Sequence, residues 1–147
     1  MSKDLRFMRS AVALAEIWSK DPSTKVCSIA VGNRPNLVAW GYNGFPPGIS
    51  DHPERLHDRE QKLQLTLHAE VNALANAPFE VQTLYVTRHP CAGCALHILA
   101  ARTVKRVVYL VDAEFEARWA DSLATSASML REGGITVEPF AFFEAPT

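Results

Sequence analysis

The sequence predicts a three-layer α/β/α domain with a five-stranded mixed sheet, and three observations support this. Strand-like apolar segments alternate with helix-like segments, which indicates a sheet with parallel members covered by helices. The chain has 147 residues, 48% of them hydrophobic and 21% charged, which is enough for one core. Neither an internal repeat nor a low-complexity tract divides it. We therefore expect a single domain over residues 1–147.

The first half of the chain is expected to supply one helix and a hairpin. Residues 5–18 place apolar side chains at helical spacing, and the Asp-Pro-Ser that follows ends this helix. The β-rich segments 25–32 and 37–42 flank an Asn-Arg-Pro-Asn turn, which indicates a hairpin. Residues 43–62 are polar and rich in Gly and Pro, so we expect a long loop there.

The second half is expected to alternate helices and strands. The elements are a helix from about His68, a strand at 83–87, a helix from Pro90, a strand at 106–111, a helix at 114–131 and a strand at 135–142. Pro90 suits a helix start because the N–H that proline lacks has no intrahelical acceptor there. Gly133 and Gly134 end the last helix. The predicted order is α-β-β-α-β-α-β-α-β.

Two short motifs carry the candidate chemistry, His68-Ala69-Glu70 and Pro90-Cys91-Ala92-Gly93-Cys94. Cys91 and Cys94 are three residues apart, so one helical turn points both sulfurs the same way. Two thiolates and one imidazole suit Zn²⁺, and three protein ligands leave a fourth position for water, as in catalytic zinc sites. Each motif begins a helix, so both positive helix ends face the metal.

Glu70 follows His68 by two residues and is expected to approach the metal without binding it. In the first turn of a helix, both side chains can converge on a point ahead of the helix end. The carboxylate is then placed to take a proton from a water at the metal and pass it on. We therefore predict that Glu70 is the catalytic acid and base.

Two other interpretations of the cysteine pair remain open, a redox pair and a structural zinc site. A structural site needs a fourth protein ligand. The spare candidates are His52, His57, His89 and His97. Cys27 lies in an apolar run and is interpreted as a small core residue. The joint presence of both motifs favours the catalytic interpretation.

The chain resembles the cytidine and deoxycytidylate deaminase superfamily, and within it the dCMP deaminases most closely. The segments His68–Leu74 and Pro90–Ala95 form the superfamily's zinc signature. Two further segments, Ser19–Val26 and Gly41–Gly48, point to the dCMP branch. The resemblance implies a cytidine-deaminase-like fold and the hydrolysis of dCMP to dUMP and ammonia, which feeds thymidylate synthesis. It leaves open whether 5-substituted dCMP is also a substrate.

The resemblance also implies roles for single residues. Asn43 is expected to hold the sugar and orient the pyrimidine, the Ala69 N–H to contact the pyrimidine carbonyl, and Lys25 to lie near the 5′-phosphate. Members of this branch are often oligomers, commonly hexamers, and many are regulated by dCTP and dTTP, so a homo-oligomer is expected. A regulatory nucleotide with Mg²⁺ is expected at the Gly44–Gly48 loop.

Three features depart from the pattern of the resembling family. Cys27 stands where a glycine is usual, and Arg88-His89 stands before Pro90 in place of an apolar and a small residue. The loop from Asn43 to His68 is shorter than in many members of the family, which argues against a second, structural zinc, although His52, His57 and Asp58 leave that alternative open.

The charge of the chain favours a small substrate. The formal net charge is −1, without a run of Lys or Arg, which disfavours a polynucleotide partner. No apolar stretch approaches the length of a membrane span and no secretory signal is recognised, so a cytoplasmic location is expected. The alternatives are a deaminase of single-stranded DNA or tRNA, and a non-catalytic zinc domain that binds a nucleotide.

Overall fold

The computed structural model describes residues 1–142 of the chain, so residues 143–147 of the predicted domain lie outside the described residues. The elements are, in order, α1 (Lys3–Trp18), β1 (Cys27–Val31), β2 (Val38–Tyr42), α2 (Pro53–His57), α3 (Arg59–Leu65), α4 (Ala69–Asn76), β3 (Thr83–Val86), α5 (Ala92–Ala100), β4 (Arg106–Leu110), α6 (Ala113–Arg118), α7 (Ala120–Glu132) and β5 (Thr136–Phe140). In the described part of the chain, no helix is both long and apolar enough to cross a membrane.

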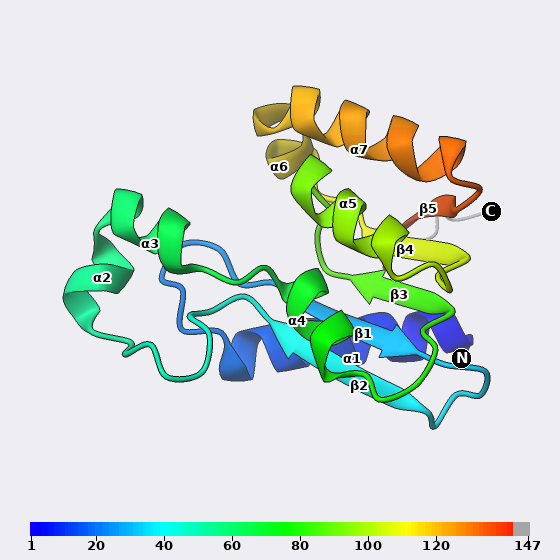
Figure 1. The fold of residues 1–147 in the computed structure, drawn as a ribbon, viewed down its shortest axis with the longest axis horizontal. Coiled ribbons are helices and arrows are strands. Elements are labelled where there is room, and N and C mark those ends of the chain that lie inside the picture. The colour runs from blue at the N-terminus through cyan, green and yellow to red at the C-terminus, as the bar shows by residue number, and fades with distance from the viewer. Residues whose placement is uncertain (143–147) are drawn as a thin grey trace.

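The five strands form one mixed sheet in the order β2-β1-β3-β4-β5 (Figure 1). β1 is antiparallel to both of its neighbours, and β3, β4 and β5 run parallel to one another. The parallel strands are joined through α5 and through α6–α7, as the crossover rule for parallel strands requires. The five-stranded mixed sheet predicted from the sequence is confirmed.

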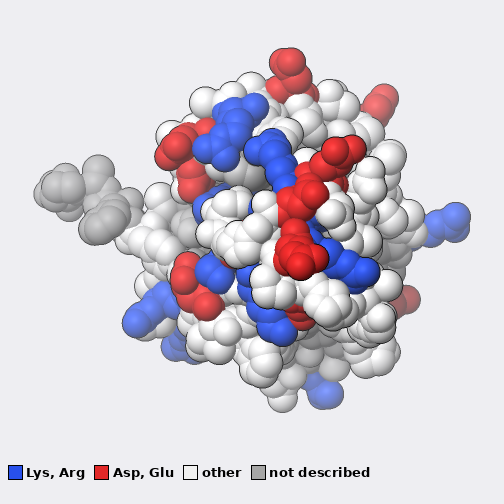
Figure 2. Space-filling model, turned by 90° about the vertical axis from the view of Figure 1, so that its left-hand side faces the viewer, with Lys and Arg blue, Asp and Glu red and all other residues white. Residues whose placement is uncertain are grey.

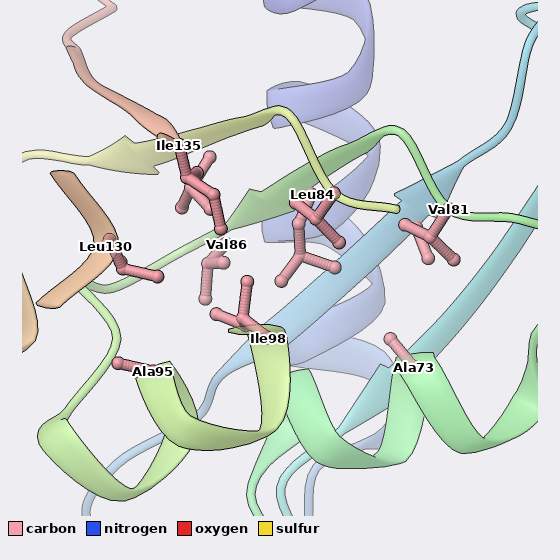
Figure 3. Close-up of a cluster of buried hydrophobic side chains, with 11 residues drawn as sticks. Ala73, Val81, Leu84, Val86, Ala95, Ile98, Leu130 and Ile135 are labelled. Atoms are coloured by element: carbon pink, nitrogen blue, oxygen red, sulfur yellow. The ribbon is translucent and has the colours of Figure 1, made fainter. Parts of the chain in front are cut away.

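Each face of the sheet has its own apolar core. On one face, Met8, Ala11 and Ala15 of α1 pack against Ile29 and its neighbours in the sheet. On the other face, α4, α5 and α7 cover the sheet, and their side chains meet those of β1, β3 and β4 (Figure 3). This gives the three predicted layers, with α1 on one side and three helices on the other (Figure 1).

α4 lies unusually close to the edge strand β2. A Cβ atom on Gly41 would come within 2.5 Å of the Ala73 backbone nitrogen and 2.7 Å of the Asn72 Cβ, so only glycine fits there. The outward carbonyls of β2 are also occupied by α4, because the Asn72 amide donates to Tyr42 O and the Asn76 amide donates to Trp40 O. β2 therefore fixes the height and direction of α4.

The prediction of a loop over residues 43–62 is wrong, because α2 and α3 lie within it. Neither helix has a buried residue, so no apolar periodicity marks it. Their starts are set by backbone chemistry instead. Pro53 occupies the first turn of α2, and the Asp58 carboxylate accepts from the first amides of α3.

The predicted helix over residues 114–131 is divided in two. Trp119 has φ −112° and ψ 24°, which ends α6 and begins α7 in a new direction. The hydrophobic spacing continues across this break, so the sequence pattern alone does not reveal it. The final strand is also shorter than the predicted 135–142.

Candidate metal centre and its surroundings

Three of the predicted site residues come together where two helices begin. His68 is the N-cap residue of α4, Cys91 is the N-cap residue of α5, and Cys94 lies in the first turn of α5. The Nδ1 atom of His68 lies 3.2 Å from Cys94 Sγ and 3.6 Å from Cys91 Sγ. The ligand atoms of all three residues lie within 4.8 Å of one another, which is the spacing a single metal ion needs.

The electrostatics of this group fit a thiolate-bound cation. Hydrogen bonding to the Cys94 side chain, opposed by burial and helped by His68, lowers the pKa of the Cys91 thiol to about 3. The same contact raises the pKa of Cys94, and the contact with Cys91 raises the pKa of His68. The Cys91 sulfur is therefore the one that carries negative charge in this group. One nitrogen and two sulfurs are a donor set that suits Zn²⁺.

A fourth protein ligand is absent from this group among residues 1–142. His97 lies on α5 but is exposed to solvent and is not a member, and His52, His57 and His89 are not members either. No second group of metal-binding side chains forms in the described residues around His52, His57 and Asp58. The structural-zinc interpretation therefore lacks the ligand it requires.

Glu70 is buried beside the group, in the first turn of α4, with 5% of its surface exposed. Burial raises the pKa of its carboxyl group, while the positive charge of His68 opposes this rise. The Ala69 N–H next to it is the first amide of α4, a position that has no acceptor within a helix. A buried carboxylate and an amide without an intrahelical acceptor thus lie next to the candidate metal-binding side chains.

Asn43 holds together the segment that follows α1. Its Oδ1 atom accepts from the Ser19 hydroxyl (2.7 Å) and the Val26 N–H (2.8 Å), and its Nδ2 atom donates to Thr24 O (2.7 Å). Lys25 donates to the carbonyl of the same Ser19. An asparagine amide offers two donors and two acceptor lone pairs, so these contacts leave one N–H for a ligand.

The unusual residues before Pro90 pack into the protein. His89 is buried with its ring edge-on to Tyr109, at 4.5 Å between ring centroids. The Arg88 guanidinium lies 3.4 Å from an Asp112 carboxylate oxygen and 5.7 Å from the centre of the Phe115 ring. These contacts favour the packing interpretation of both residues.

The Gly44–Gly48 loop borders a cleft on the α2–α3 side of the molecule. Gly44 and Phe45 line it together with Lys20, Asp21 and Lys62. Lys20 is paired with Asp51 at 2.9 Å, and Lys62 with Asp21 at 3.1 Å. The pair of Lys62 and Asp21 connects α3 to the segment after α1. The two residues are 41 positions apart, and no local sequence pattern indicates their contact.

One contact at the metal-binding helix was not predicted. The Ser122 hydroxyl of α7 accepts a hydrogen bond of 3.1 Å from the Ala92 N–H at the start of α5. Thirty positions separate these residues in the sequence, and a single serine in a helix carries no signal of such a role.

Comparisons with known proteins show which family the chain is similar to. A family model described as "Cytidine and deoxycytidylate deaminase zinc-binding region" matches residues 1–111. An uncharacterized deaminase in the luxG 3′ region of Aliivibrio fischeri is 34% identical over 134 residues, which are 90% of this chain and 89% of that protein. The deoxycytidylate deaminase of Mus musculus is 34% identical over 132 residues, 83% of this chain and 71% of that protein.

A solved structure is similar over nearly the whole chain. The dCMP deaminase of cyanophage S-TIM5 matches with a TM-score of 0.68 and 26% identity, covering 93% of this chain and 96% of that chain. The fold is therefore of the α/β type predicted from the resemblance.

Proposed function

The chain belongs to the cytidine and deoxycytidylate deaminase family, and from that premise we propose that it hydrolyses dCMP to dUMP and ammonia. The observation that carries the proposal is the meeting of His68, Cys91 and Cys94 beside the buried Glu70. The product would feed thymidylate synthesis, and 5-substituted dCMP is proposed as a further substrate.

The three clustered side chains are proposed to hold one Zn²⁺. When bound, Zn²⁺ supplies Lewis-acid chemistry that lowers the pKa of water toward neutrality. His68 and Cys91 bind from the two helix starts, and the positive ends of α4 and α5 offset the thiolate charge. Cys94 is buried and completes the set.

Glu70 is proposed to move the protons. Its carboxylate takes a proton from the attacking water and delivers it to N3 of the cytosine ring. It then takes the remaining proton from the hydroxyl group that has been added to C4 and delivers it to the amino group. The C4–N bond breaks, the C4 carbonyl forms and ammonia leaves. Burial supports this role, because a raised carboxyl pKa brings the group closer to the pH at which it must both accept and donate.

The remaining contacts to the substrate are proposed from the family. The Ala69 N–H donates to the pyrimidine carbonyl, and Lys25 lies toward the 5′-phosphate. Asn43 contacts the sugar through its one remaining N–H, while its other amide contacts shape the pocket wall. We further propose a homo-oligomer, with a hexamer as the leading form, and a regulatory nucleotide with Mg²⁺ at the Gly44–Gly48 loop.

The surface charge supports a small nucleotide over a polynucleotide. On the α2–α3 side of the molecule, basic and acidic side chains alternate (Figure 2). Two basic side chains beside α3 are paired with carboxylates, Lys20 with Asp51 and Lys62 with Asp21. A strand-binding groove would instead need a continuous basic track with aromatic platforms.

The proposal is tested by ammonia release from zinc-loaded protein. Its substrates are dCMP, 5-methyl-dCMP, CMP, deoxycytidine, dCTP and a cytosine oligonucleotide, assayed in parallel. Rapid release from dCMP alone or with its 5-methyl form is expected. Release only from the oligonucleotide would move the function to nucleic-acid deamination. Zinc and nucleotide binding without any release would identify a non-catalytic domain.

A further inference from the structure

The N-terminus of α5 lacks a capping group of its own. An N-cap residue is normally Ser, Thr, Asp or Asn, whose side chain accepts from the first amides of the helix. In α5 this position is Cys91, and its side chain makes no cap hydrogen bond. The sulfur lies instead beside His68. The use of this residue at the proposed metal site thus leaves the first amides of α5 to find other acceptors.

One such acceptor comes from another helix. The Ser122 hydroxyl, in the first turn of α7, lies 3.1 Å from the Ala92 nitrogen and accepts its hydrogen bond. The Ala92 N–H belongs to the peptide group that directly follows the Cys91 Cα atom. Fixing that peptide plane fixes the direction in which the Cys91 side chain leaves the backbone.

α7 is held firmly enough for this task. Leu123 follows Ser122 and is 6% exposed, and Leu130 is fully buried. Leu130 belongs to the same core cluster as Ala95 and Ile98 of α5 (Figure 3). The break at Trp119 begins α7 at the point that brings Ser122 opposite Ala92.

From this geometry we infer that Ser122 is a positioning residue for the metal ligand Cys91, acting through the Ala92 amide. The inference rests on the proposed zinc site. Hydrogen bonds that orient metal ligands are usually worth about 10–100-fold in metal affinity. Ser122 contacts the backbone beside the ligand and not the ligand side chain itself. We therefore expect its removal to lower zinc affinity by about 10-fold, the lower end of this range.

The test measures zinc affinity by competition with a chromophoric chelator, together with the cobalt–thiolate absorption of the Co²⁺-loaded protein. Ser122→Ala should weaken zinc binding about 10-fold and shift the cobalt–thiolate bands. Ser122→Thr, which keeps the hydroxyl, should restore both. The matched control is Ser126→Ala, one turn along α7, where the serine is buried and its hydroxyl has no hydrogen-bond partner in the described residues.

The outcomes separate this inference from the proposed function. The positioning role would be overturned if Ser122→Ala had the same zinc affinity and the same cobalt spectrum as Ser126→Ala and the parent protein. Weak zinc binding by the parent protein itself, or undiminished binding by Cys91→Ala, would overturn the zinc site. A urea unfolding curve of each chelated variant distinguishes lost metal affinity from general loss of stability.

Discussion

Glu70 is almost fully buried at the start of α4, next to the candidate metal ligands. Among residues 1–142, no other acidic side chain combines these features. Glu70→Gln keeps the shape but cannot accept the proton. We expect kcat for ammonia release to fall by about 10²–10⁴-fold or more, with zinc content and the circular dichroism spectrum unchanged.

The matched control for this prediction is Glu80→Gln, because Glu80 is an exposed residue in the segment between α4 and β3. It should have the kinetics of the parent protein. A Glu70→Gln variant with near-normal kcat would show that another group moves the protons.

The three cysteines provide a second comparison at the scale of single residues. Cys27 belongs to the core on the α1 face of the sheet, and burial raises the pKa of its thiol to about 12. Cys91 lies at the α5 N-terminus, where the pKa of its thiol is lowered. Cys27 thus lies among apolar side chains and is not a member of the group that Cys91 and Cys94 form with His68.

Cys91→Ala should therefore purify without zinc and release no ammonia. Cys27→Ala should keep about one zinc per chain, with a modest loss of stability from the small cavity. Elemental analysis after dialysis against a weak chelator measures both. Loss of zinc from the folded Cys27 variant would mean that the wrong thiols have been assigned to the metal.

At the scale of elements, the contact of α4 with β2 controls the position of half of the metal site. The helix carries Glu70 and begins at His68, and Gly41 is the residue that allows it to lie so close to the strand. Gly41→Ala would place a Cβ atom 2.5 Å from the Ala73 backbone nitrogen. Because that neighbour is backbone, the helix as a whole must move.

We expect Gly41→Ala to lower the free energy of unfolding by about 1–3 kcal/mol and to weaken zinc binding, since His68 moves with the helix. Gly44→Ala is the control, because its new Cβ would meet only the Tyr42 ring, at 3.5 Å. Thermal unfolding and chelator competition on both variants check the prediction. Similar values for the two variants would refute the role of the close contact.

Elements with strong apolar periodicity could be predicted from the sequence, and those defined by backbone chemistry could not. The strands and the helices that begin at His68 and Cys91 were expected close to their observed positions, because each buries an apolar face or carries a recognisable motif. α2 and α3 bury no residue. Their helical state depends on proline geometry and the Asp58 cap, signals that are weak within a polar segment.

The same limit applies to the site. The candidate metal-binding side chains lie in two recognisable motifs that occur together in the resembling family, so their meeting could be foreseen. Two sets of hydrogen bonds depend instead on how distant segments pack. One joins Ser122 to Ala92, and the other joins the Asn43 amide to Ser19, Thr24 and Val26. Sequence spacing carries no information about such contacts, which is why the largely structural use of the Asn43 amide was not anticipated.

At the scale of the whole molecule, a cluster of polar side chains fastens α1 to the sheet. Arg106 of β4 donates two hydrogen bonds to the Asp4 carboxylate, at 2.9 and 2.6 Å, and also contacts Glu138 of β5. The Tyr85 hydroxyl of β3 donates to the same Asp4 at 2.6 Å. Side chains from α1, β3, β4 and β5 therefore meet in this cluster. Asp4 and Arg106 are 102 positions apart in the sequence.

This cluster gives the stability of the protein a defined dependence on pH. The Arg106 hydrogen bonds, opposed by burial and helped by Tyr85, hold the pKa of Asp4 below its ordinary value. A carboxyl group with a lowered folded-state pKa stabilises the fold above its unfolded pKa of about 3.9 and loses this effect as the pH falls through the folded value. The contribution is thus complete at neutral pH and disappears only in acid.

Asp4→Asn should reduce the free energy of unfolding at pH 7 by about 1–3 kcal/mol, the usual worth of hydrogen bonds to charged groups. The difference from the parent protein should stay constant down to about pH 5 and begin to shrink below about pH 4, where this carboxyl group takes up a proton in the unfolded chain. Urea unfolding of both proteins from pH 7 to pH 3.5 measures it. Asp51→Asn removes the exposed pair with Lys20 and should lower the free energy of unfolding at pH 7 by less than Asp4→Asn does, because solvent screens an exposed pair. Two outcomes would mean that α1 is held by its apolar face alone. In the first, the loss of unfolding free energy for Asp4→Asn stays constant down to pH 3.5. In the second, that loss is no larger than the loss for Asp51→Asn.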